Sequence, residues 1–268
     1  MKQIYGKIIN KILRRFNLIL LSLNRYQNDI GLLYDLKLKD YYNEIKRFFS
    51  NEPIVFDIGA HVGETAVFYN DIFENSKIHS FEPNKKFFYK LKENVKLLNQ
   101  KNKNKFIPHN IALGNHVEKK KYYEYSNPVL SGFYKIDDKI SSDIKKSSDL
   151  VYKFTMITET GDIFCKRNNI KNIDFLKINV QGYEPEIITG FSQMLKDKKI
   201  KFILAEFDYS GRYEKKVKIS DLENLLSNYE YEFFDFLFLR KRKQDKIKIT
   251  YGYIIFTNNI INQSSNWK

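Results

Sequence analysis

The chain has 268 residues, which is long enough for one well-buried α/β domain with some additional structure. Its hydrophobic content of 43% and aromatic content of 16% are those of a globular protein and exclude wholesale disorder. The formal net charge is +14, which permits an anionic partner. The basic residues are spread along the whole sequence, however, so a nucleic-acid partner is not expected.

Cysteine and histidine usage limits the chemistry further. Cys165 is the only cysteine, which excludes an intrachain disulfide and a Cys-based zinc cluster and makes a reducing cytoplasm the expected location. The four histidines show no metal-ligating spacing, so no metal site is expected. The longest N-terminal apolar run, residues 16–23, is too short to span a bilayer, and no signal-peptide cleavage site follows it.

Residues 1–50 are predicted to form a basic, helical extension ahead of a single domain over residues 51–260. Apolar residues recur at a spacing of four and predict an amphipathic helix: Ile4, Ile8, Ile12 and Phe16. This helix packs on the domain or on a partner subunit of a homo-oligomer, or it lies peripherally at the inner face of the membrane. A second helix is predicted over residues 36–49.

The first motif of the domain runs from Pro53 to Thr65. A short apolar segment ends at Asp57, two glycines follow at Gly59 and Gly63, and a helical pattern then begins. Glycine allows the backbone to turn sharply and a ligand to approach closely. The motif therefore predicts a buried strand, a tight turn and a helix, the arrangement with which an open α/β sheet binds a small ligand.

The rest of the chain alternates between strand and helix patterns. A second strand ends at Glu82 and Pro83, and Asn84 is the expected N-cap of the following helix, whose apolar face includes Phe87 and Leu91. Further strands are predicted over residues 106–113, 119–125, 154–158, 173–180, 202–208, 231–239 and 248–257. Further helices are predicted over residues 162–167, 184–195 and 222–226.

Two connections have a special character. Residues 126–150 are polar and have no clear period, which indicates either a mobile surface insertion or a lid over a site. Residues 241–246 are too few for a helical crossover, so the last two strands should be antiparallel. The sequence thus predicts a mostly parallel sheet that is closed by an antiparallel hairpin.

The glycine pattern limits the class of ligand that this motif can bind. The dinucleotide fingerprint G-x-G-x-x-G is absent, because Ala60 and His61 stand where the second glycine and its neighbour would be. The pattern that remains is D-x-G-x-x-x-G with an acid, Glu82, at the end of the next strand. A carboxylate there can accept hydrogen bonds from both ribose hydroxyls of a nucleoside.

Four blocks in a fixed order give the chain a family resemblance: residues 55–64, 81–83, 110–114 and 175–184. With these blocks it resembles the FkbM-type S-adenosylmethionine-dependent methyltransferases over about residues 53 to 207. The resemblance implies a class I methyltransferase (Rossmann-like) α/β fold, with a seven-stranded, mostly parallel sheet whose C-terminal strand is antiparallel. It also implies S-adenosyl-L-methionine as the cofactor of a methyltransferase domain over residues 51–260.

The resemblance assigns cofactor contacts residue by residue. Gly59, Ala60 and Gly63 would shape the loop under the methionine part, Glu82 would bind the ribose, and Asn110 would lie beside the adenine. The full set of implied cofactor-binding residues is Asp57, Gly59, Ala60, His61, Gly63, Thr65, Glu82, Pro83, Asn110, Ala112 and Asn179. Lys177 and Asn179 would face the methyl donor and acceptor.

One departure from the family concerns catalysis. Where the family usually has Ile-Asp-Val-Glu-Gly, this chain has Asn179 and Gln181 in place of both acids. Amides cannot act as general bases and are poor ligands for a hard cation. The expected catalytic residues are therefore Lys177 and Asn179 together with two acids at the next strand end, Glu206 and Asp208, as candidate bases.

The resulting expectation is an O-methyltransferase that acts on a sugar hydroxyl of a bacterial surface glycan or a related natural product, with a glycan or sugar-containing acceptor as its partner. An alternative is a non-catalytic S-adenosylmethionine-binding protein in glycan assembly, which the two amides allow. A further alternative is an RNA methyltransferase, which the basic charge suggests. Against it, no N/D-P-P-F/Y motif follows the fourth strand, and Cys165 lies outside the sheet motifs.

Overall fold

The computed structural model describes residues 41–100, 103–138, 148–241 and 249–258. Two units are distinguished along the chain, Met1–Tyr41 and Tyr42–Lys268. The helix predicted from Ile4 to Phe16 lies outside the described residues. At the end of the helix predicted over residues 36–49, residues 41–45 are helical and a 3₁₀ turn, η1 (Lys46–Phe48), follows.

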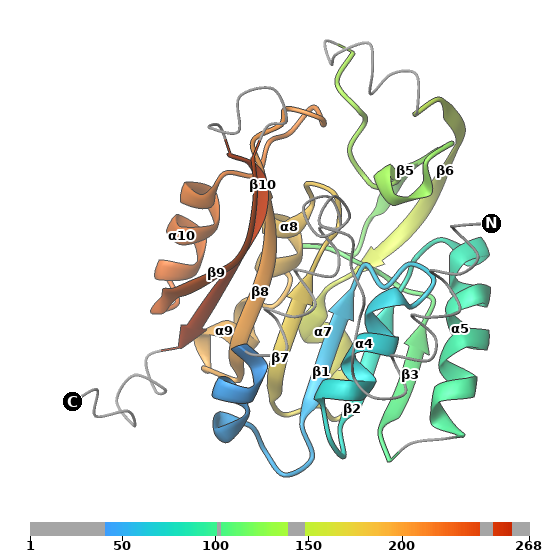
Figure 1. The fold of residues 1–268 in the computed structure, drawn as a ribbon. Coiled ribbons are helices and arrows are strands. Elements are labelled where there is room, and N and C mark those ends of the chain that lie inside the picture. The colour runs from blue at the N-terminus through green and yellow to red at the C-terminus, as the bar shows by residue number, and fades with distance from the viewer. Residues whose placement is uncertain (1–40, 101–102, 139–147, 242–248, 259–268) are drawn as a thin grey trace, which may run out of the picture. The chain divides into compact units, whose positions relative to one another are not determined.

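A seven-stranded sheet forms the centre of the second unit (Figure 1). Its strands, in chain order, are β1 (Ile54–Ile58), β2 (Lys77–Phe81), β3 (Lys105–His109), β7 (Ile173–Ile178), β8 (Ile200–Asp208), β9 (Tyr231–Lys241) and β10 (Ile249–Asn258). They lie in the order β3-β2-β1-β7-β8-β10-β9. The first five of these are mutually parallel, and β10 is antiparallel to both of its neighbours. This is the class I methyltransferase fold, as predicted, with the expected antiparallel hairpin at its C-terminal end.

Burial follows from the position of each strand. Every residue of the central strand β7 is buried, as expected for a parallel strand that is covered on both faces. On one face Phe175 packs against Tyr69 of α4 (Glu64–Ile72) and against Phe73, the C-cap residue of that helix. On the other face Phe56 packs against Phe164 of α7 (Gly161–Arg167).

The remaining helices are α5 (Lys85–Asn99), α8 (Glu184–Thr189), α9 (Ser192–Lys196) and α10 (Ile219–Ser227). The predicted cap of α5 is confirmed, because the Asn84 side chain accepts a hydrogen bond from the Lys86 amide at 3.0 Å. The single helix predicted over residues 184–195 is instead divided at Gly190. A Cβ at that position would lie 2.1 Å from the Gly114 carbonyl oxygen. Glycine therefore allows the backbone at residue 190 to lie directly against the backbone at residue 114.

A smaller sheet projects beyond the carboxyl ends of the main sheet, at the upper right of Figure 1. It contains β4 (Ala112–Leu113), β5 (Lys119–Tyr125) and β6 (Leu150–Glu159), in the order β4-β6-β5. The strand predicted over residues 106–113 is therefore wrong in extent, because it is divided at Asn110. The side-chain amide of Asn110 donates to the carbonyls of Glu82 and Pro83, each at 2.9 Å, and this ends the pairing with β2.

The connection from β5 to β6 contains a 3₁₀ turn, η2 (Pro128–Leu130). Residues 139–147 of this connection lie outside the described part. Within the residues that the structure describes, no helix has the length and apolar character needed to cross a membrane.

Candidate functional site

The loop after β1 depends on a glycine that no other residue can replace without strain. Gly59 has φ of +80°, and a Cβ built on it would lie 2.0 Å from the Asn179 carbonyl oxygen. The amides of Gly59 and Ala60 both donate to the Phe81 carbonyl, at 3.1 and 3.0 Å. The loop is thus held between the ends of β2 and β7.

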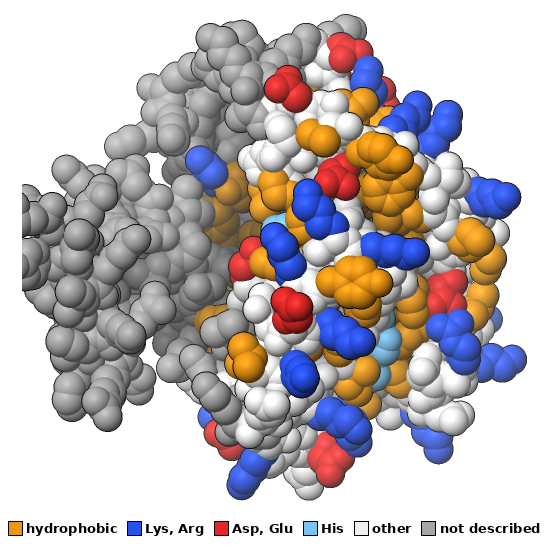
Figure 2. Space-filling model, turned by 90° about the vertical axis from the view of Figure 1, so that its right-hand side faces the viewer, with side chains coloured by type: hydrophobic (Ala, Val, Ile, Leu, Met, Phe, Trp, Pro, Cys, Tyr) orange, Lys and Arg blue, Asp and Glu red, His pale blue; other side chains and the backbone are white. Residues whose placement is uncertain are grey.

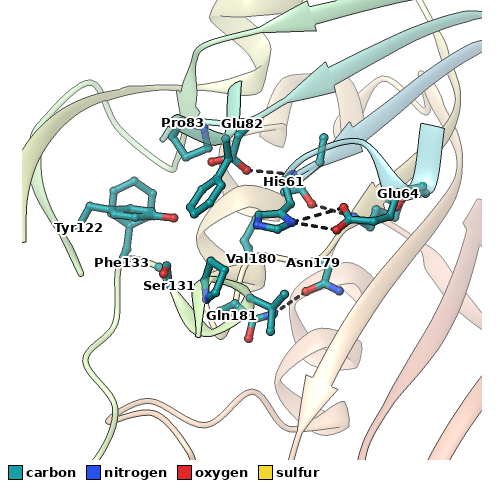
Figure 3. Close-up of a pocket in the computed structure, with 18 residues that line it drawn as sticks. His61, Glu64, Glu82, Pro83, Tyr122, Ser131, Phe133, Asn179, Val180 and Gln181 are labelled. Atoms are coloured by element: carbon teal, nitrogen blue, oxygen red, sulfur yellow. Dashed lines mark hydrogen bonds and ion pairs between the residues drawn. The ribbon is translucent and has the colours of Figure 1, made fainter. Parts of the chain in front are cut away.

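A cavity of about 220 Å³ opens at this edge of the sheet. Figure 3 shows His61 and Glu64 on one side of it, with Tyr122 and Phe133 facing them from the other. Eight of the residues predicted from the sequence line this cavity: Gly59, Ala60, His61, Thr65, Glu82, Pro83, Lys177 and Asn179. Residues from β1, β2 and β7 therefore meet in one place, although more than a hundred positions of sequence separate the first from the last.

Glu82 is the acid at the end of β2, and it is 5% exposed. Its carboxylate accepts hydrogen bonds from the His61 amide at 2.9 Å and from the Asn84 amide at 2.8 Å. Burial raises the pKa of Glu82 to about 7, while these two backbone amides oppose the shift. The side chain is fixed in place and lines the cavity, so further lone pairs of its oxygens can accept hydrogen bonds from a ligand.

His61 lies within the loop at φ of +49°. Its Nδ1 is 3.1 Å from Oε1 of Glu64, and its ring centroid is 4.5 Å from that of Phe87. The imidazole is therefore oriented by one polar and one aromatic neighbour at the entrance of α4.

Asp57 and Lys177 form a buried ion pair beneath the loop. Lys177 Nζ donates to Asp57 Oδ1 at 2.7 Å and to the Gly59 carbonyl at 3.2 Å, and the side chains of Lys177 and Asp57 are 6% and 0% exposed. The ammonium group has two partners on β1 and its loop. This geometry supports the loop beneath the cavity.

Five other predicted residues do not line the cavity: Gly63, Asn110, Ala112, Glu206 and Asp208. Gly63 is the N-cap of α4, and Asn110 joins the end of β3 to the backbone at Glu82 and Pro83. Ala112 is buried in the smaller sheet. Asp57, described above, also lies behind the cavity wall rather than in it.

The two amides that replace the usual acids are part of a hydrogen-bonded chain. Asn179 Nδ2 donates to the Tyr253 hydroxyl at 2.7 Å, and Asn179 Oδ1 accepts from Gln181 Nε2 at 2.8 Å. The Tyr213 hydroxyl in turn donates to Gln181 Oε1 at 2.6 Å. Donors and acceptors alternate along this chain, and Gln181 is held at φ of +60°, a conformation that needs such support.

Glu206 extends this chain toward the next strand, since Gln181 Nε2 lies 3.4 Å from Glu206 Oε2. Burial, together with the neighbouring carboxylates of Glu184 and Asp208, raises the pKa of Glu206 to about 8. Glu184 is 1% exposed, accepts from the Val180 amide at 2.9 Å, and has its pKa raised by burial to about 7. Among the described residues, no group of three or more His, Cys, Asp or Glu side chains is placed to hold a metal ion.

Sequence reasoning missed one wall of the cavity. It is formed by β5 and by the segment after it, through Tyr122, Pro128, Val129, Ser131, Gly132 and Phe133. Gly132 pairs with Tyr123 across an isolated bridge, which holds the segment against β5. The only available signal was the aperiodic stretch of residues 126–150, whose described part forms this wall over the site.

Four more lining residues were also missed: Glu64, Phe87, Val180 and Gln181. Gln181 was noted in the sequence only as a departure from the family. The cavity thus combines a glycine loop, a buried acid, two amides and an aromatic wall. This combination can bind a nucleoside and an attached polar group.

A comparison with protein-family models identifies the family. A family model described as the methyltransferase FkbM domain matches residues 57–233. A search of the curated proteins found no match.

Several solved structures are similar to this chain. M. capricolum TrmK in complex with S-adenosyl-homocysteine is 12% identical, with a TM-score of 0.43 and coverage of 82% of this chain and 68% of that chain. The magnesium protoporphyrin IX methyltransferase of Synechocystis PCC 6803 with bound S-adenosylmethionine is 9% identical, with a TM-score of 0.47 and 96% coverage of both chains. An rRNA methylase from Streptococcus thermophilus is 10% identical, with a TM-score of 0.44 and coverage of 83% and 96%. At these identities the likeness concerns the fold alone.

Proposed function

Because this chain belongs to the FkbM methyltransferase family, we propose that it transfers a methyl group from S-adenosylmethionine to a sugar hydroxyl of a bacterial surface glycan or a related natural product. Methyl transfer and the cofactor follow from the family. The hydroxyl acceptor is the proposed part. The observation that carries it is Glu206, a partly buried carboxyl group with a raised pKa, which is joined to the cavity through Gln181.

The residues at the cavity fit the cofactor. Gly59 lets the loop after β1 pack directly against the Asn179 backbone, and the buried Glu82 carboxylate is held in place by two backbone amides. We propose that Glu82 binds the ribose hydroxyls and that Pro83, His61 and Thr65 complete the contacts. When bound, the sulfonium cofactor supplies an already activated methyl group, so alignment provides much of the acceleration.

The acceptor hydroxyl must still lose its proton. In this proposal Glu206 accepts that proton, and Gln181 and Asn179 hold Glu206 and the acceptor in position. A base with a pKa near the working pH contributes about 10²–10⁴-fold to the rate. Asp208 lies two residues further along β8 on the same face of the sheet, and it keeps the pKa of Glu206 high by repulsion.

The direct test combines binding and turnover. Calorimetric titration with S-adenosylmethionine should show binding, and transfer of a labelled methyl group to sugar acceptors should show turnover. Glu206→Gln should lower kcat by about 10²–10⁴-fold and leave the affinity for S-adenosylmethionine unchanged. Glu223→Gln, an exposed glutamate on α10, is the matched control and should retain full activity. Equal kcat in both variants would exclude Glu206 as the base.

The pH dependence follows from the same group. Because the pKa of Glu206 is raised to about 8, its basic form becomes populated as the pH rises toward that value. We expect kcat to increase from about pH 6 and to level off only above about pH 9, roughly one unit above the pKa of Glu206, with the increase absent in Glu206→Gln.

The alternative of a degenerate, non-catalytic site is favoured by the loss of both acids at positions 179 and 181. The double change Asn179→Asp with Gln181→Glu tests it. A carboxylate at 181 would lie beside Glu206 and would lack the Nε2 donor that now serves Asn179 and Glu206, so we expect turnover to fall. An increase in turnover would identify the natural site as degenerate. Labelled-methyl incorporation into total RNA, in place of sugars, would overturn the proposed acceptor class.

A further inference from the structure

Two arginines lie near the same tyrosine at the carboxyl end of β8. The centroid of the Tyr251 ring is 5.4 Å from Cζ of Arg240 and 6.0 Å from Cζ of Arg212. Arg240 Nη1 also donates to the Tyr251 hydroxyl at 2.9 Å. All three side chains are partly buried.

Strand register places this cluster next to the cavity. Tyr253 is paired with Glu206, and Tyr251 is paired with Asp208 and with Arg240. Residues directly opposite one another share a face of the sheet, so the Tyr251 row lies beside the row that contains Glu206. Tyr253 binds Asn179 of the cavity wall, and Tyr251 is two residues further toward the carboxyl edge, about 7 Å along the strand. This separation is comparable with the span of one sugar ring.

The guanidinium groups have donors to spare. Within the described residues, neither Arg212 nor Arg240 forms an ion pair with a carboxylate. Tyr213 is a hydrogen-bonding neighbour of Arg212, whose Cζ lies 5.9 Å from the centroid of that ring, and Asp208 and Glu206 also act on Arg212 electrostatically. Asp208 already accepts a hydrogen bond from the Ser210 amide. Partly buried arginines are normally paired, and a planar guanidinium is well suited to bind phosphate in a bidentate manner.

General positive charge does not explain the cluster. Figure 2 shows one face of the molecule, on which Lys and Arg side chains are scattered among acidic and hydrophobic ones. Lysines dominate the basic residues of the sequence, and they are spread throughout it. An aromatic ring with two partly buried arginines, next to a cavity, is a different arrangement from this solvated surface charge.

We propose that Arg212 and Arg240, together with Tyr251, bind a phosphoryl group attached to the acceptor sugar, so that the preferred acceptor is a phosphorylated sugar. This inference rests on the proposed function for the nature of the acceptor. The Tyr251 ring offers an apolar surface for the sugar, and the sugar hydroxyl is then directed toward Glu206. A sugar monophosphate and a diphosphate-linked sugar share this chemistry.

The first test measures anion binding without any methyl transfer. Inorganic pyrophosphate is titrated into the full chain by calorimetry, with S-adenosylhomocysteine present. Arg240→Gln should weaken the affinity roughly tenfold or more, since two charge-assisted hydrogen bonds are lost. Arg47→Gln is the matched control, because Arg47 also lies over an aromatic ring, 4.7 Å from the Phe48 centroid, but is exposed and belongs to η1. It should bind pyrophosphate as the unmodified protein does.

Arg212 needs a different substitution, because its charge offsets Asp208. Arg212→Lys keeps the charge and loses the planar fork, so it should also weaken pyrophosphate binding with little change in Tm. Failure of pyrophosphate to bind, or equal affinity in Arg240→Gln and Arg47→Gln, would overturn the inference.

The second test compares acceptors. The free sugar, its 1-phosphate and its nucleoside diphosphate derivative are assayed for methyl transfer, and kcat/KM should be at least tenfold higher for a phosphorylated form. Arg240→Gln should remove this preference mainly by raising KM. The phosphorylated form with the higher kcat/KM shows whether the bound phosphoryl group belongs to a sugar monophosphate or to a diphosphate-linked sugar. Equal use of the free sugar would overturn the inference and leave the proposed function intact. A different result would overturn the proposed function and leave the anion site intact. In that case the protein would methylate none of the sugars, and pyrophosphate binding would still be lost in Arg240→Gln but not in Arg47→Gln.

Discussion

At the scale of single residues, Gly59 illustrates how a local motif depends on a distant one. Its positive φ is a property of the loop, but the close contact with the Asn179 carbonyl comes from a strand 120 positions away. The sequence pattern around Gly59 indicates a glycine turn but gives no sign of this contact. The contact with β7 explains why the glycine is required even if the turn itself could tolerate another residue.

We expect Gly59→Ala to reduce the affinity for S-adenosylmethionine at least tenfold and to lower Tm. The left-handed conformation costs a non-glycine residue about 1–2 kcal/mol, and the contact at 2.0 Å must in addition displace the β7 loop. Calorimetry and thermal unfolding measure the two effects. Gly211→Ala is the control, because Gly211 has φ of +72° but its Cβ would meet only the flexible end of Lys216. Similar losses in both variants would argue against the steric explanation.

The Asp57–Lys177 pair is the second residue-level prediction. Lys177→Met should lower the free energy of unfolding by about 3–5 kcal/mol, because it leaves Asp57 buried without its partner. The double variant Asp57→Asn with Lys177→Met should recover part of this loss. Denaturant unfolding of the two single variants and the double variant measures the coupling. Purely additive losses would show that the pair is not coupled.

At the scale of elements, Asp174 holds the segment before β1 to the middle of the sheet. Its carboxylate accepts from the Ser50 amide and hydroxyl, each at 3.0 Å, and from the Ile54 amide at 2.9 Å. Lys201 of β8 donates to it at 2.7 Å. Three elements thus converge on one buried acid at the amino end of β7.

Asp174→Ala should therefore lower the free energy of unfolding by at least about 3 kcal/mol. Binding of S-adenosylmethionine by the folded protein should be unchanged, because Asp174 lies at the opposite end of the strands from the cavity. Denaturant unfolding and calorimetry test the two statements. Asp149→Ala, at an exposed aspartate, should have no measurable effect on stability.

Element boundaries show where sequence patterns fail. Strands of the main sheet are recognisable because burial on both faces produces short segments in which apolar residues predominate, as in β1, β7 and β8. The divisions at Asn110 and Gly190 are not recognisable, since each depends on a backbone group from another part of the chain. The spacing of apolar residues predicts which residues are buried. It does not predict where the backbone of a distant segment will come into contact.

At the scale of the whole molecule, buried carboxyl groups make stability depend on pH. Burial raises the pKa of Glu82 and Glu184 to about 7 and that of Glu206 to about 8, so the folded state binds more protons than the unfolded state above the ordinary glutamate pKa. Burial lowers the pKa of His79 to about 3 and that of His109 to about 4. Below the ordinary histidine pKa, these two groups therefore bind fewer protons in the folded state than in the unfolded state. Above the ordinary histidine pKa the three carboxyl groups contribute first, and at higher pH Cys165, whose pKa burial raises to about 12, has an effect of the same sign.

The free energy of unfolding should therefore fall as the pH rises from about 6.5 to about 9, through the folded-state pKa values of the three carboxyl groups. Denaturant unfolding at a series of pH values measures it. Glu206→Gln removes one of the three titrating groups and should make the slope shallower, whereas the exposed control Glu223→Gln should leave it unchanged. A flat or rising stability over this window would contradict the assignment of buried, protonated carboxyl groups.

The sequence by itself determined the alternation of strands and helices, the antiparallel end of the sheet, the glycine loop with its acid at Glu82, and the replacement of two acids by Asn179 and Gln181. Each of these features depends on residues that are neighbours in the sequence, because burial patterns, turn geometry and capping act over a few positions. Only the tertiary structure decided that Tyr122 and Phe133 form a wall of the cavity, that Tyr213 and Tyr253 hold the two amides, and that Arg212 and Arg240 meet at Tyr251. Those residues come from segments far apart in the chain. They are brought together by strand order and register, which no local pattern encodes.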